Sequence, residues 1–421
     1  MHAPAGAPKR ATLGAIFFTV FLDLLGFGLV MPFLAKEARD TFGTTAFAAT
    51  LLGSAYSLMQ FLFVPIWGRL SDRVGRRPVL LWSIAGTSLS MAGLGLGLAY
   101  GNSIAWLFAA RCFAGIATAN LGTATAYIAD ITKPEDRAKG MGLIGVAFGL
   151  GFILGPGIGG ALAEYTIHGH VGPLPCLVAA GLSLINLVWA ATSLVESLPP
   201  ERRAARAPRS LAPLNFVAVK NAFALPGVAL AIAVNFLIIV SFTNLDQTFT
   251  FFCADAFGID VRGTGYVLAF IGITAAVVQG GLIRPLSKRV SESRMIRAGT
   301  LLQALAFAGF VASATLGQRA LLYASGAVLA IGNGLTQPSV SAFISKRAPA
   351  NAQGATLGAN QSFASLARAF GPGFGGYLYG TIGARAPYAA AAVGMLAAFA
   401  MALTLRETGK TTAKVMGDAT P

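Results

Sequence analysis

Long apolar runs that follow one another along the whole chain are the feature that most constrains its fold. Each run is about 20 residues or longer, which is enough to cross the hydrocarbon core of a bilayer as a helix. Of the 421 residues, 55% are hydrophobic and only 11% are charged, whereas a soluble domain has roughly 25% charged residues. The sequence therefore predicts an all-α membrane protein. The twelve expected spans are residues 12–34, 46–67, 78–100, 104–129, 138–163, 172–195, 223–252, 262–283, 295–316, 319–344, 353–380 and 386–405.

The distribution of basic residues predicts the orientation of these spans, because loops rich in Lys and Arg stay in the cytoplasm. Twelve spans place both termini on one side, and 24 of the 31 Lys and Arg residues fall there. The five on the other side are Lys36, Arg39, Arg262, Arg319 and Arg385. We expect cytoplasmic termini in a bacterial inner membrane. The net charge of +15 then reflects membrane topology and not binding to nucleic acid.

The two halves of the chain repeat each other at a constant offset of 216 residues. The stretch Leu70 to Val74 recurs as Leu286 to Val290, and Gly155 to Gly160 recurs as Gly371 to Gly376. A segment rich in Arg, Pro and Ala separates the copies. The pattern predicts a duplicated six-helix bundle. We expect bundles at residues 1–195 and 222–421, with a cytoplasmic linker at 196–221 and a short cytoplasmic tail.

The loop expected after the second span carries an acid among several arginines. A positive-inside loop explains the arginines, but it does not explain Asp72 or two glycines suited to a tight turn. The loop resembles the signature of the major facilitator superfamily through Gly68, Leu70, Asp72, Arg73, Gly75, Arg76 and Arg77. The resemblance implies twelve helices in two pseudo-symmetric six-helix bundles. It also implies that Asp72 latches one conformation through a neighbouring helix end and a basic residue. Lys288 stands at the equivalent place in the second copy, so the latch should be one-sided.

The fifth span contains small residues at regular spacing, which let membrane helices approach closely. They are Gly142, Gly151, Gly155, Pro156, Gly159 and Gly160. Plain helix packing is one interpretation. The spacing also resembles the antiporter motif of the superfamily, which is found mainly in exporters, and this implies export. We expect Gly151 and Gly155 to lie at the interface between the two halves.

Four ionisable residues inside the spans are the candidates for proton coupling. Charges in hydrocarbon are costly and usually mark a functional or paired site. Asp23 is the first candidate, because a buried carboxyl group can take up and release a proton. Arg111, Asp246 and Arg368 are the others, and the sequence does not name the partner of Arg368. The alternative for each is a permanent salt bridge, a snorkelling side chain or a wet vestibule.

The first span and most of the chain resemble the tetracycline-efflux branch of the superfamily. Three membrane ionisable groups of that branch are missing, since Ser90, Ala275 and Gln303 stand at or near their positions. Metal-chelated tetracycline is therefore a doubtful substrate. Polar side chains in the spans are candidates for the substrate cavity: Tyr56, Gln60, Asn120, Asn235, Asn244, Gln279, Asn333, Gln337, Asn360 and Gln361.

These features predict a secondary transporter that exports small, largely apolar compounds by proton antiport and alternating access. The alternatives are metabolite uptake, facilitated diffusion, a lipid flippase or a membrane receptor on the same scaffold. Phosphate-binding loops, metal-ligand clusters and nucleophile pairs are missing from the sequence, so we expect no enzyme activity, no cofactor and no metal. The expected partners are a small-molecule substrate, protons and the bilayer, around a monomer.

Overall fold

The computed structural model consists of helices, and one isolated β-bridge joins Ile167 to His170. It describes residues 9–31, 33–101, 103–119, 121–132, 137–163, 165–198, 200, 201, 203, 220, 223–287, 289–349 and 353–405. Asn120 and Lys288 lie outside these residues. The helices are α1 (Lys9–Val30), α2 (Leu34–Phe42), α3 (Ala46–Val74), α4 (Arg76–Tyr100), α5 (Ile104–Ala117), α6 (Leu121–Ile131), α7 (Arg137–Leu162), α8 (Pro173–Ser193), α11 (Val228–Phe257), α12 (Val261–Val277), the π-helix η2 (Val278–Leu282), α13 (Ile283–Leu286), α14 (Glu292–Leu316), α15 (Arg319–Arg347), α16 (Gln353–Thr381) and α17 (Ala386–Leu403).

Each predicted span overlaps a helix, and within the described residues nine helical stretches are long and apolar enough to cross a membrane. The fourth span is divided between α5 and α6, because the chain turns at Thr118 and Ala119. The eighth continues from α12 into the π-helix, a rare conformation that is frequent at functional sites. Helix α2 occupies an expected loop, since Leu34, Ala35 and Ala38 bury one face of it.

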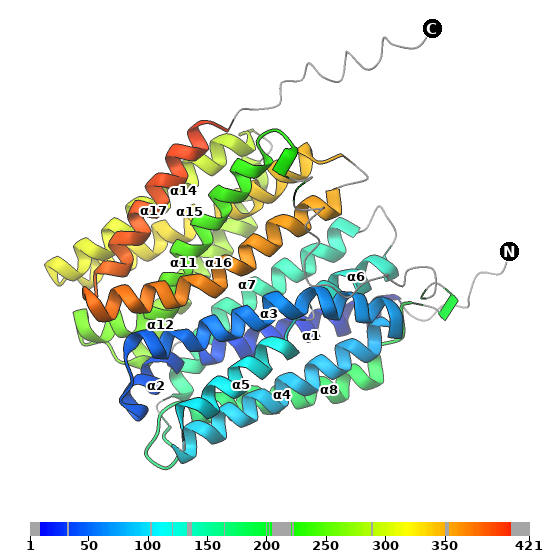
Figure 1. Cartoon of the computed structure of the whole chain (residues 1–421), viewed down its shortest axis with the longest axis horizontal. Coiled ribbons are helices and arrows are strands. Elements are labelled where there is room, and N and C mark those ends of the chain that lie inside the picture. The colour runs from blue at the N-terminus through cyan, green and yellow to red at the C-terminus, as the bar shows by residue number, and fades with distance from the viewer. Residues whose placement is uncertain are drawn as a thin grey trace, which may run out of the picture.

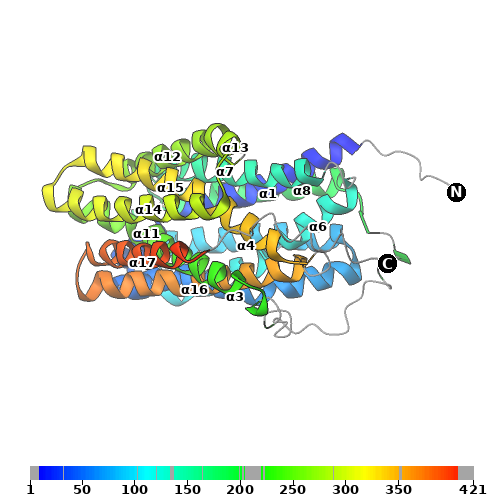
Figure 2. The ribbon, with the colours of Figure 1, turned by 90° about the horizontal axis from the view of Figure 1, so that it is seen from above.

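The helices form two groups that lie side by side (Figure 1). Helices α1 to α8 pack against one another, and helices α11 to α17 do the same. The groups meet mainly through two helix pairs, α3 with α16 and α7 with α12. Seen from above, these two pairs lie in opposite layers of the molecule (Figure 2).

The internal repeat relates the two helix pairs to each other. An offset of 216 residues carries α3 onto residues 262–290, where α12 lies, and carries α7 onto 353–378, within α16. The contact of α3 with α16 therefore corresponds to that of α12 with α7. Gly160 of α7 faces Gly265 of α12, and its counterpart Gly376 of α16 faces Thr50 of α3. The duplication thus produces two equivalent contacts between the groups.

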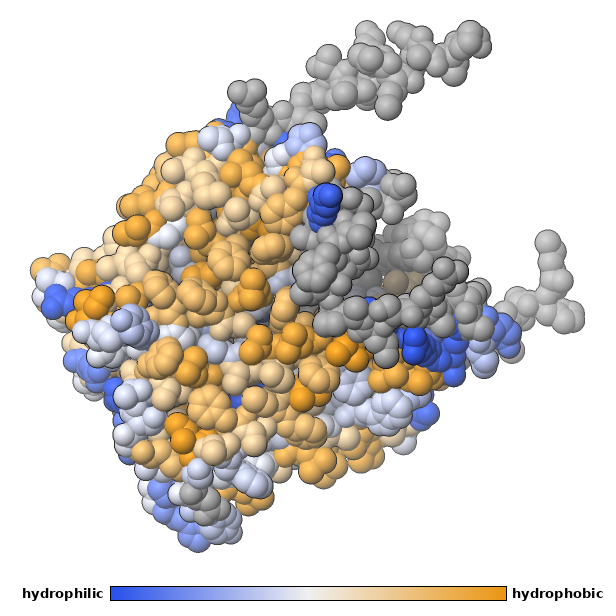
Figure 3. All heavy atoms as spheres, viewed as in Figure 1, coloured by the Kyte–Doolittle hydropathy of each residue, from blue (hydrophilic) through white to orange (hydrophobic). Residues whose placement is uncertain are grey.

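The outer surface of the bundle is strongly apolar. Figure 3 shows broad hydrophobic areas over the helices and hydrophilic residues at the margins. Leu89, Ile185 and Val188 are each more than half exposed. Soluble monomers rarely expose a contiguous apolar area of this extent. Such a surface is suited to contact with the lipid of a bilayer.

Candidate functional site

Tyr56 of α3 gathers side chains from neighbouring helices near the middle of the molecule. Its ring centroid lies 5.6 Å from that of Phe27 in α1, and the Arg111 guanidinium of α5 lies 4.4 Å from the centroid of the Tyr56 ring. Thr118 Oγ1 is 2.8 Å from the phenol oxygen, and Gln60 donates a hydrogen bond to that oxygen at 3.4 Å. The Tyr56 side chain is thus in contact with an arginine, an aromatic ring and two polar side chains.

Arg111 and Asp246 interact across the boundary between the two helix groups. Arg111 is buried in α5, where its Nε donates to the Leu52 carbonyl at 3.4 Å. Asp246, in α11, lies close enough to Arg111 for an electrostatic interaction, and its carboxylate also bonds to the Gln247 side chain. Asp246 Oδ1 is buried and has no hydrogen-bond partner among the described residues. This carboxylate oxygen therefore has unused hydrogen-bonding capacity.

Arg368 and Asp23 complete the set of membrane charges named from the sequence. Arg368, in α16, donates from Nη2 to Ser365 Oγ at 3.0 Å and interacts electrostatically with Tyr56. Asp23, in α1, also interacts electrostatically with Tyr56. Arg111 thus lies directly against the Tyr56 ring, Asp23 and Arg368 interact with Tyr56 electrostatically, and Asp246 interacts electrostatically with Arg111. The sequence did not name Ser365, which accepts a hydrogen bond from Arg368, or Tyr56, with which Arg368 interacts electrostatically.

The glycines of α7 face two different helices. A Cβ atom at Gly151 would lie 2.8 Å from Leu24 Cβ, and one at Gly155 would lie 2.6 Å from Gly28 Cα. Both neighbours belong to α1, in the same helix group, so the expectation that these two glycines lie between the halves was wrong. A Cβ atom at Gly160 would lie 3.1 Å from Gly265 Cα in α12, in the other group. The motif therefore serves both contacts of α7.

The other three residues of the glycine motif are Pro156, Gly159 and Gly142. Pro156 lies inside α7, and its carbonyl oxygen is close to Gly265. Gly159 packs against the backbone of Leu29 in α1. Gly142 lies near the start of α7, where the side-chain surroundings are outside the described residues. Close approach of α7 to both α1 and α12 thus needs small residues on two faces of one helix.

The signature expected in a loop lies instead on the ends of α3 and α4. Helix α3 continues to Val74, and Arg76 begins α4. The chain turns only at Gly75, whose φ of +111° suits glycine, and a Cβ atom there would also lie 2.8 Å from the Glu196 carboxyl carbon. Gly68 is inside α3 with open space around it. Of the two glycines, Gly75 alone makes the turn.

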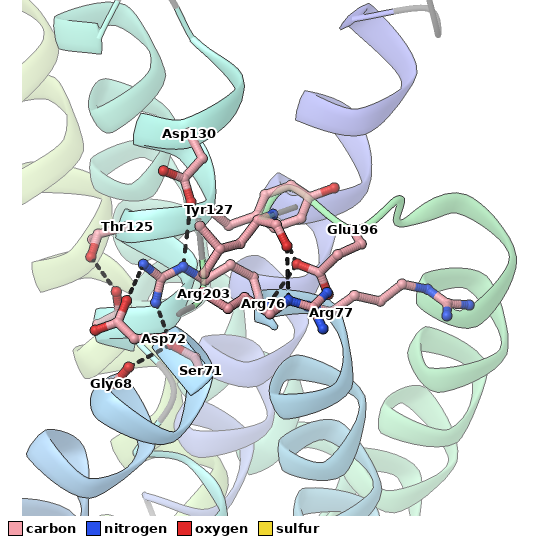
Figure 4. A network of polar contacts seen from close by, with 12 residues as sticks. Gly68, Ser71, Asp72, Arg76, Arg77, Thr125, Tyr127, Asp130, Glu196 and Arg203 are labelled. Atoms are coloured by element: carbon pink, nitrogen blue, oxygen red, sulfur yellow. Dashed lines mark hydrogen bonds and ion pairs between the residues drawn. The ribbon is translucent and has the colours of Figure 1, made fainter. Parts of the chain in front are cut away.

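Arg76 is the centre of the charged network at this end of the bundle (Figure 4). Its guanidinium pairs with Asp72 at 2.6 Å and with Asp130 of α6 at 3.4 Å. It also hydrogen-bonds to Ser71 Oγ, which itself donates to the Gly68 carbonyl at 2.6 Å. The basic partner implied for Asp72 is therefore Arg76. Arg73 is exposed beside this network.

Glu196, placed in the expected linker, was missed by the sequence analysis as part of this network. Its carboxylate accepts the backbone N–H groups of Arg76 and Arg77 at 2.9 and 3.2 Å. A carboxylate at a helix N-terminus satisfies unpaired N–H groups and opposes the positive end of the helix dipole. Arg203 lies 3.6 Å from the same carboxylate, and Arg77 donates to the Ala191 carbonyl at 2.7 Å. The only sequence signal was an acid directly after the sixth span.

The remaining cavity candidates are dispersed. Asn235 donates to Asn360 at 3.0 Å, so these two bridge α11 and α16. Asn244 packs against Gly375, and Asn333 is partly buried in α15. Three others are exposed: Gln279, Gln337 and Gln361. Among the described members of this set, Tyr56 and Gln60 are the two that lie at the charged centre, where Gln60 donates to the Tyr56 hydroxyl.

Comparison with known proteins identifies the family. The chain matches the profile described as Major Facilitator Superfamily over residues 16–372 and 321–419. It is 35% identical to the class C tetracycline resistance protein of Escherichia coli, over 85% of this chain and 87% of that protein. It is 32% identical to the Bos taurus major facilitator superfamily domain-containing protein 10, over 96% of this chain and 95% of that one.

A solved structure with a similar fold supports the same family assignment. The crystal structure described as the human organic anion transporter MFSD10 (TETRAN) has a TM-score of 0.70 to this chain and 26% sequence identity. The match covers 94% of this chain and 100% of that one. These matches, the apolar helices and the paired helix groups have one explanation: the chain is a multi-pass membrane transporter, not an enzyme, and belongs to the major facilitator superfamily.

Proposed function

We propose that this chain is a proton-coupled antiporter that exports small, largely apolar compounds. The relatives named as tetracycline resistance proteins and the complete glycine motif of α7 support export. The proposal depends on the buried Asp246 of one helix group, which lies within electrostatic range of the buried Arg111 of the other. A proton on Asp246 cancels its charge and weakens its attraction to Arg111. Proton occupancy thereby changes an interaction between the groups.

The halves that rock are proposed to be residues 1–195 and 222–421, joined by the linker 196–221. In the structure, contacts between the two helix groups gather around one end. The Gly373 N–H donates to Ser54 Oγ at 3.1 Å, and Arg39 lies 3.9 Å from Asp255. In the predicted orientation this end faces outward. We propose that the structure represents the inward-facing state, and that proton entry from outside drives the return.

The charged network around Arg76 is the proposed latch at the cytoplasmic end. Asp72→Asn should lower the export rate on the order of tenfold, because it removes the ion pair with Arg76 and about 1.4 kcal/mol separates rates that differ tenfold. Lys288→Asn should have a mild effect, since only the first copy keeps the full signature. Initial export rates at matched protein levels measure both. Equal losses would show that the two copies do not differ as proposed.

Everted membrane vesicles with an acidic lumen test the proposed direction and coupling. A panel of neutral, anionic and cationic aromatic compounds is added outside, on the face that was cytoplasmic. We expect at least one compound to accumulate in the lumen and to leave when a protonophore collapses the gradient. Accumulation that ignores the protonophore would favour facilitated diffusion. No accumulation from outside, together with exit of the same compound from preloaded vesicles, would favour uptake, and movement of labelled lipid alone would favour a flippase.

A further inference from the structure

We propose that the π-helix η2 is a hinge, and that α13 moves about it as a gate at the cytoplasmic end of the second helix group. The inference concerns how the transporter moves, and it depends neither on proton coupling nor on export. It rests on a comparison of α12 with α3, its counterpart in the first copy. Each of these helices packs against the other helix group, α12 against α7 and α3 against α16.

At their first residues, α3 and α12 correspond at an offset of 215 residues, one less than the offset of the sequence motifs. Each helix begins with a side chain that accepts a backbone N–H group. Thr45 accepts that of Ala48, and Asp260 accepts that of Gly263. The two capping residues are 215 residues apart, and so are the two residues that they cap.

The contacts with the other helix group give the same offset. A Cβ atom at Gly376 would lie 2.9 Å from the carbonyl oxygen of Ala46. A Cβ atom at Gly160, the counterpart of Gly376, would lie 3.2 Å from the carbonyl oxygen of Val261. Ala46 and Val261 are therefore equivalent, and they are 215 residues apart. Caps and packing thus agree on the register of the two helices at this end.

Toward the other end, the second copy has gained one residue. Leu70 to Val74 recurs as Leu286 to Val290, at an offset of 216. One extra residue must therefore lie between the first turns of α12 and Leu286. The π-helix Val278–Leu282 lies in this interval, and the Ile283 N–H donates to the Val278 carbonyl, five residues before it. A π turn is wider than an α turn, so η2 accommodates the extra residue.

The first copy interrupts its helix at the same level by different means. Pro65 lies inside α3, and an offset of 215 or 216 carries it to Gly280 or Gly281, both within η2. Proline has no N–H group, so the carbonyl of Phe61 loses its helical hydrogen bond. Prolines and π turns are the usual places at which helices bend. Equivalent helices that are both interrupted at this level indicate a bending point in each half.

The segments beyond the two bending points are held differently. At the end of α3, Asp72 forms an ion pair with Arg76, which also pairs with Asp130 of α6. Within the described residues, α13 makes its helix contacts mainly with η2, to which it is joined. Around Gly280 and Gly281 there is open space, since a Cβ atom at either would meet nothing within 4 Å. The second copy therefore has the looser end.

A hinge at η2 changes what the transport cycle can do. If α12 and α13 were one rigid helix, the cytoplasmic end would close only as the contact of Gly160 with Gly265 opened. Bending at η2 lets α13 approach the first helix group while that contact is still made. Both ends of the transporter are then closed at once. The hinge thus provides an occluded state between the inward-facing and outward-facing states.

Distances between spin labels test the hinge in the purified full chain, in a background without the three native cysteines. Ile273→Cys and Arg289→Cys place exposed labels on the two sides of η2. Leu58→Cys and Arg73→Cys are the equivalent exposed pair on α3. We expect a broad or two-peaked distance distribution for the first pair and a narrow one for the second. Equally narrow distributions would overturn the proposal.

Gly280→Ala combined with Gly281→Ala should stiffen the hinge. Alanine restricts the backbone more than glycine does, and the open space accepts its methyl group. The distance distribution across η2 should narrow, and the unfolding temperature should stay the same or rise. Exchange of a transported compound without a gradient should fall about tenfold, because each substitution favours the straight helix.

The matched control is Gly93→Ala combined with Gly181→Ala. These glycines have equally open surroundings but lie inside the regular helices α4 and α8. The control should exchange the compound at the wild-type rate. Wild-type exchange by the hinge variant, or a distribution across η2 that stays as broad as before, would overturn the proposal. A drop of several degrees in unfolding temperature for the hinge variant alone would overturn it too, because the glycines would then be structural.

These results separate the hinge from the proposed function. A narrowed distribution and slower exchange, in vesicles where a protonophore has no effect, would support the hinge and refute the antiport. Protonophore-sensitive export at the wild-type rate by the hinge variant would support the antiport and refute the hinge.

Discussion

Asp246→Asn is expected to abolish uphill export while the protein still folds and binds its substrate. An amide keeps the shape of the side chain but cannot carry a proton through the cycle. In the proposed mechanism Asp246 carries the exchanged proton, since its Oδ1 is buried and its carboxylate interacts electrostatically with Arg111 of the other helix group. Accumulation of a transported compound in vesicles with an acidic lumen measures the effect. Exchange of that compound without a gradient should persist.

The control for this substitution is Asp260→Asn. Asp260 is an exposed aspartate whose carboxylate accepts the Gly263 N–H at the start of α12, and asparagine caps a helix equally well. Its transport should match that of the wild type. Asp23→Asn should resemble Asp246→Asn, since Asp23 is the second carboxyl group at this centre. Undiminished uphill export by Asp246→Asn would exclude Asp246 as the coupling acid.

Gly160→Leu is expected to block the transport cycle by opening the contact between α7 and α12. A side chain at Gly160 meets the backbone of α12, with Gly265 Cα only 3.1 Å from the position of its Cβ. The two groups would separate at this end, and the protein would favour the other conformation. A reporter cysteine at Ser54, in a background without the three native cysteines, should label faster from the outer face.

Gly155→Leu provides the matched comparison, because it changes the same helix on its other face. Its side chain would meet the backbone of Gly28 in α1, within one helix group. Overpacking there should lower the free energy of unfolding by about 1–3 kcal/mol without opening the outer face. Thermal unfolding and Ser54→Cys labelling distinguish the two variants. Identical labelling of both would contradict the assignment of these glycines to different contacts.

The sequence predicted the helices and their duplication, because apolar length and a constant offset are local properties of the chain. It did not predict which neighbour each glycine faces. Residues 151, 155 and 159 share one side of α7, and residue 160 lies about 100° further round the helix. Spacing shows that small residues share a face. Only the packing shows that α1 covers this face and that α12 covers the next.

The candidate site, too, was predicted only in part from the sequence. The sequence named Asp23, Arg111, Asp246 and Arg368, since charges within apolar runs stand out on their own. That Asp23, Arg111 and Arg368 all interact with Tyr56 was not predictable, because the interaction with Arg368 depends on the contact of α3 with α16, which joins residues more than 300 positions apart. Glu196 was hidden for a similar reason, since its backbone partners at the start of α4 lie 120 and 119 residues away.

Proton movement in liposomes that contain only this protein tests proton-coupled antiport most directly. The lumen is acidic and holds a pH-sensitive dye, and a compound that accumulates in the vesicle assay is added outside. The account predicts that the luminal pH rises as the compound enters, with no rise for Asp246→Asn or for liposomes without protein. Entry of the compound at the wild-type rate with an unchanged luminal pH would contradict it.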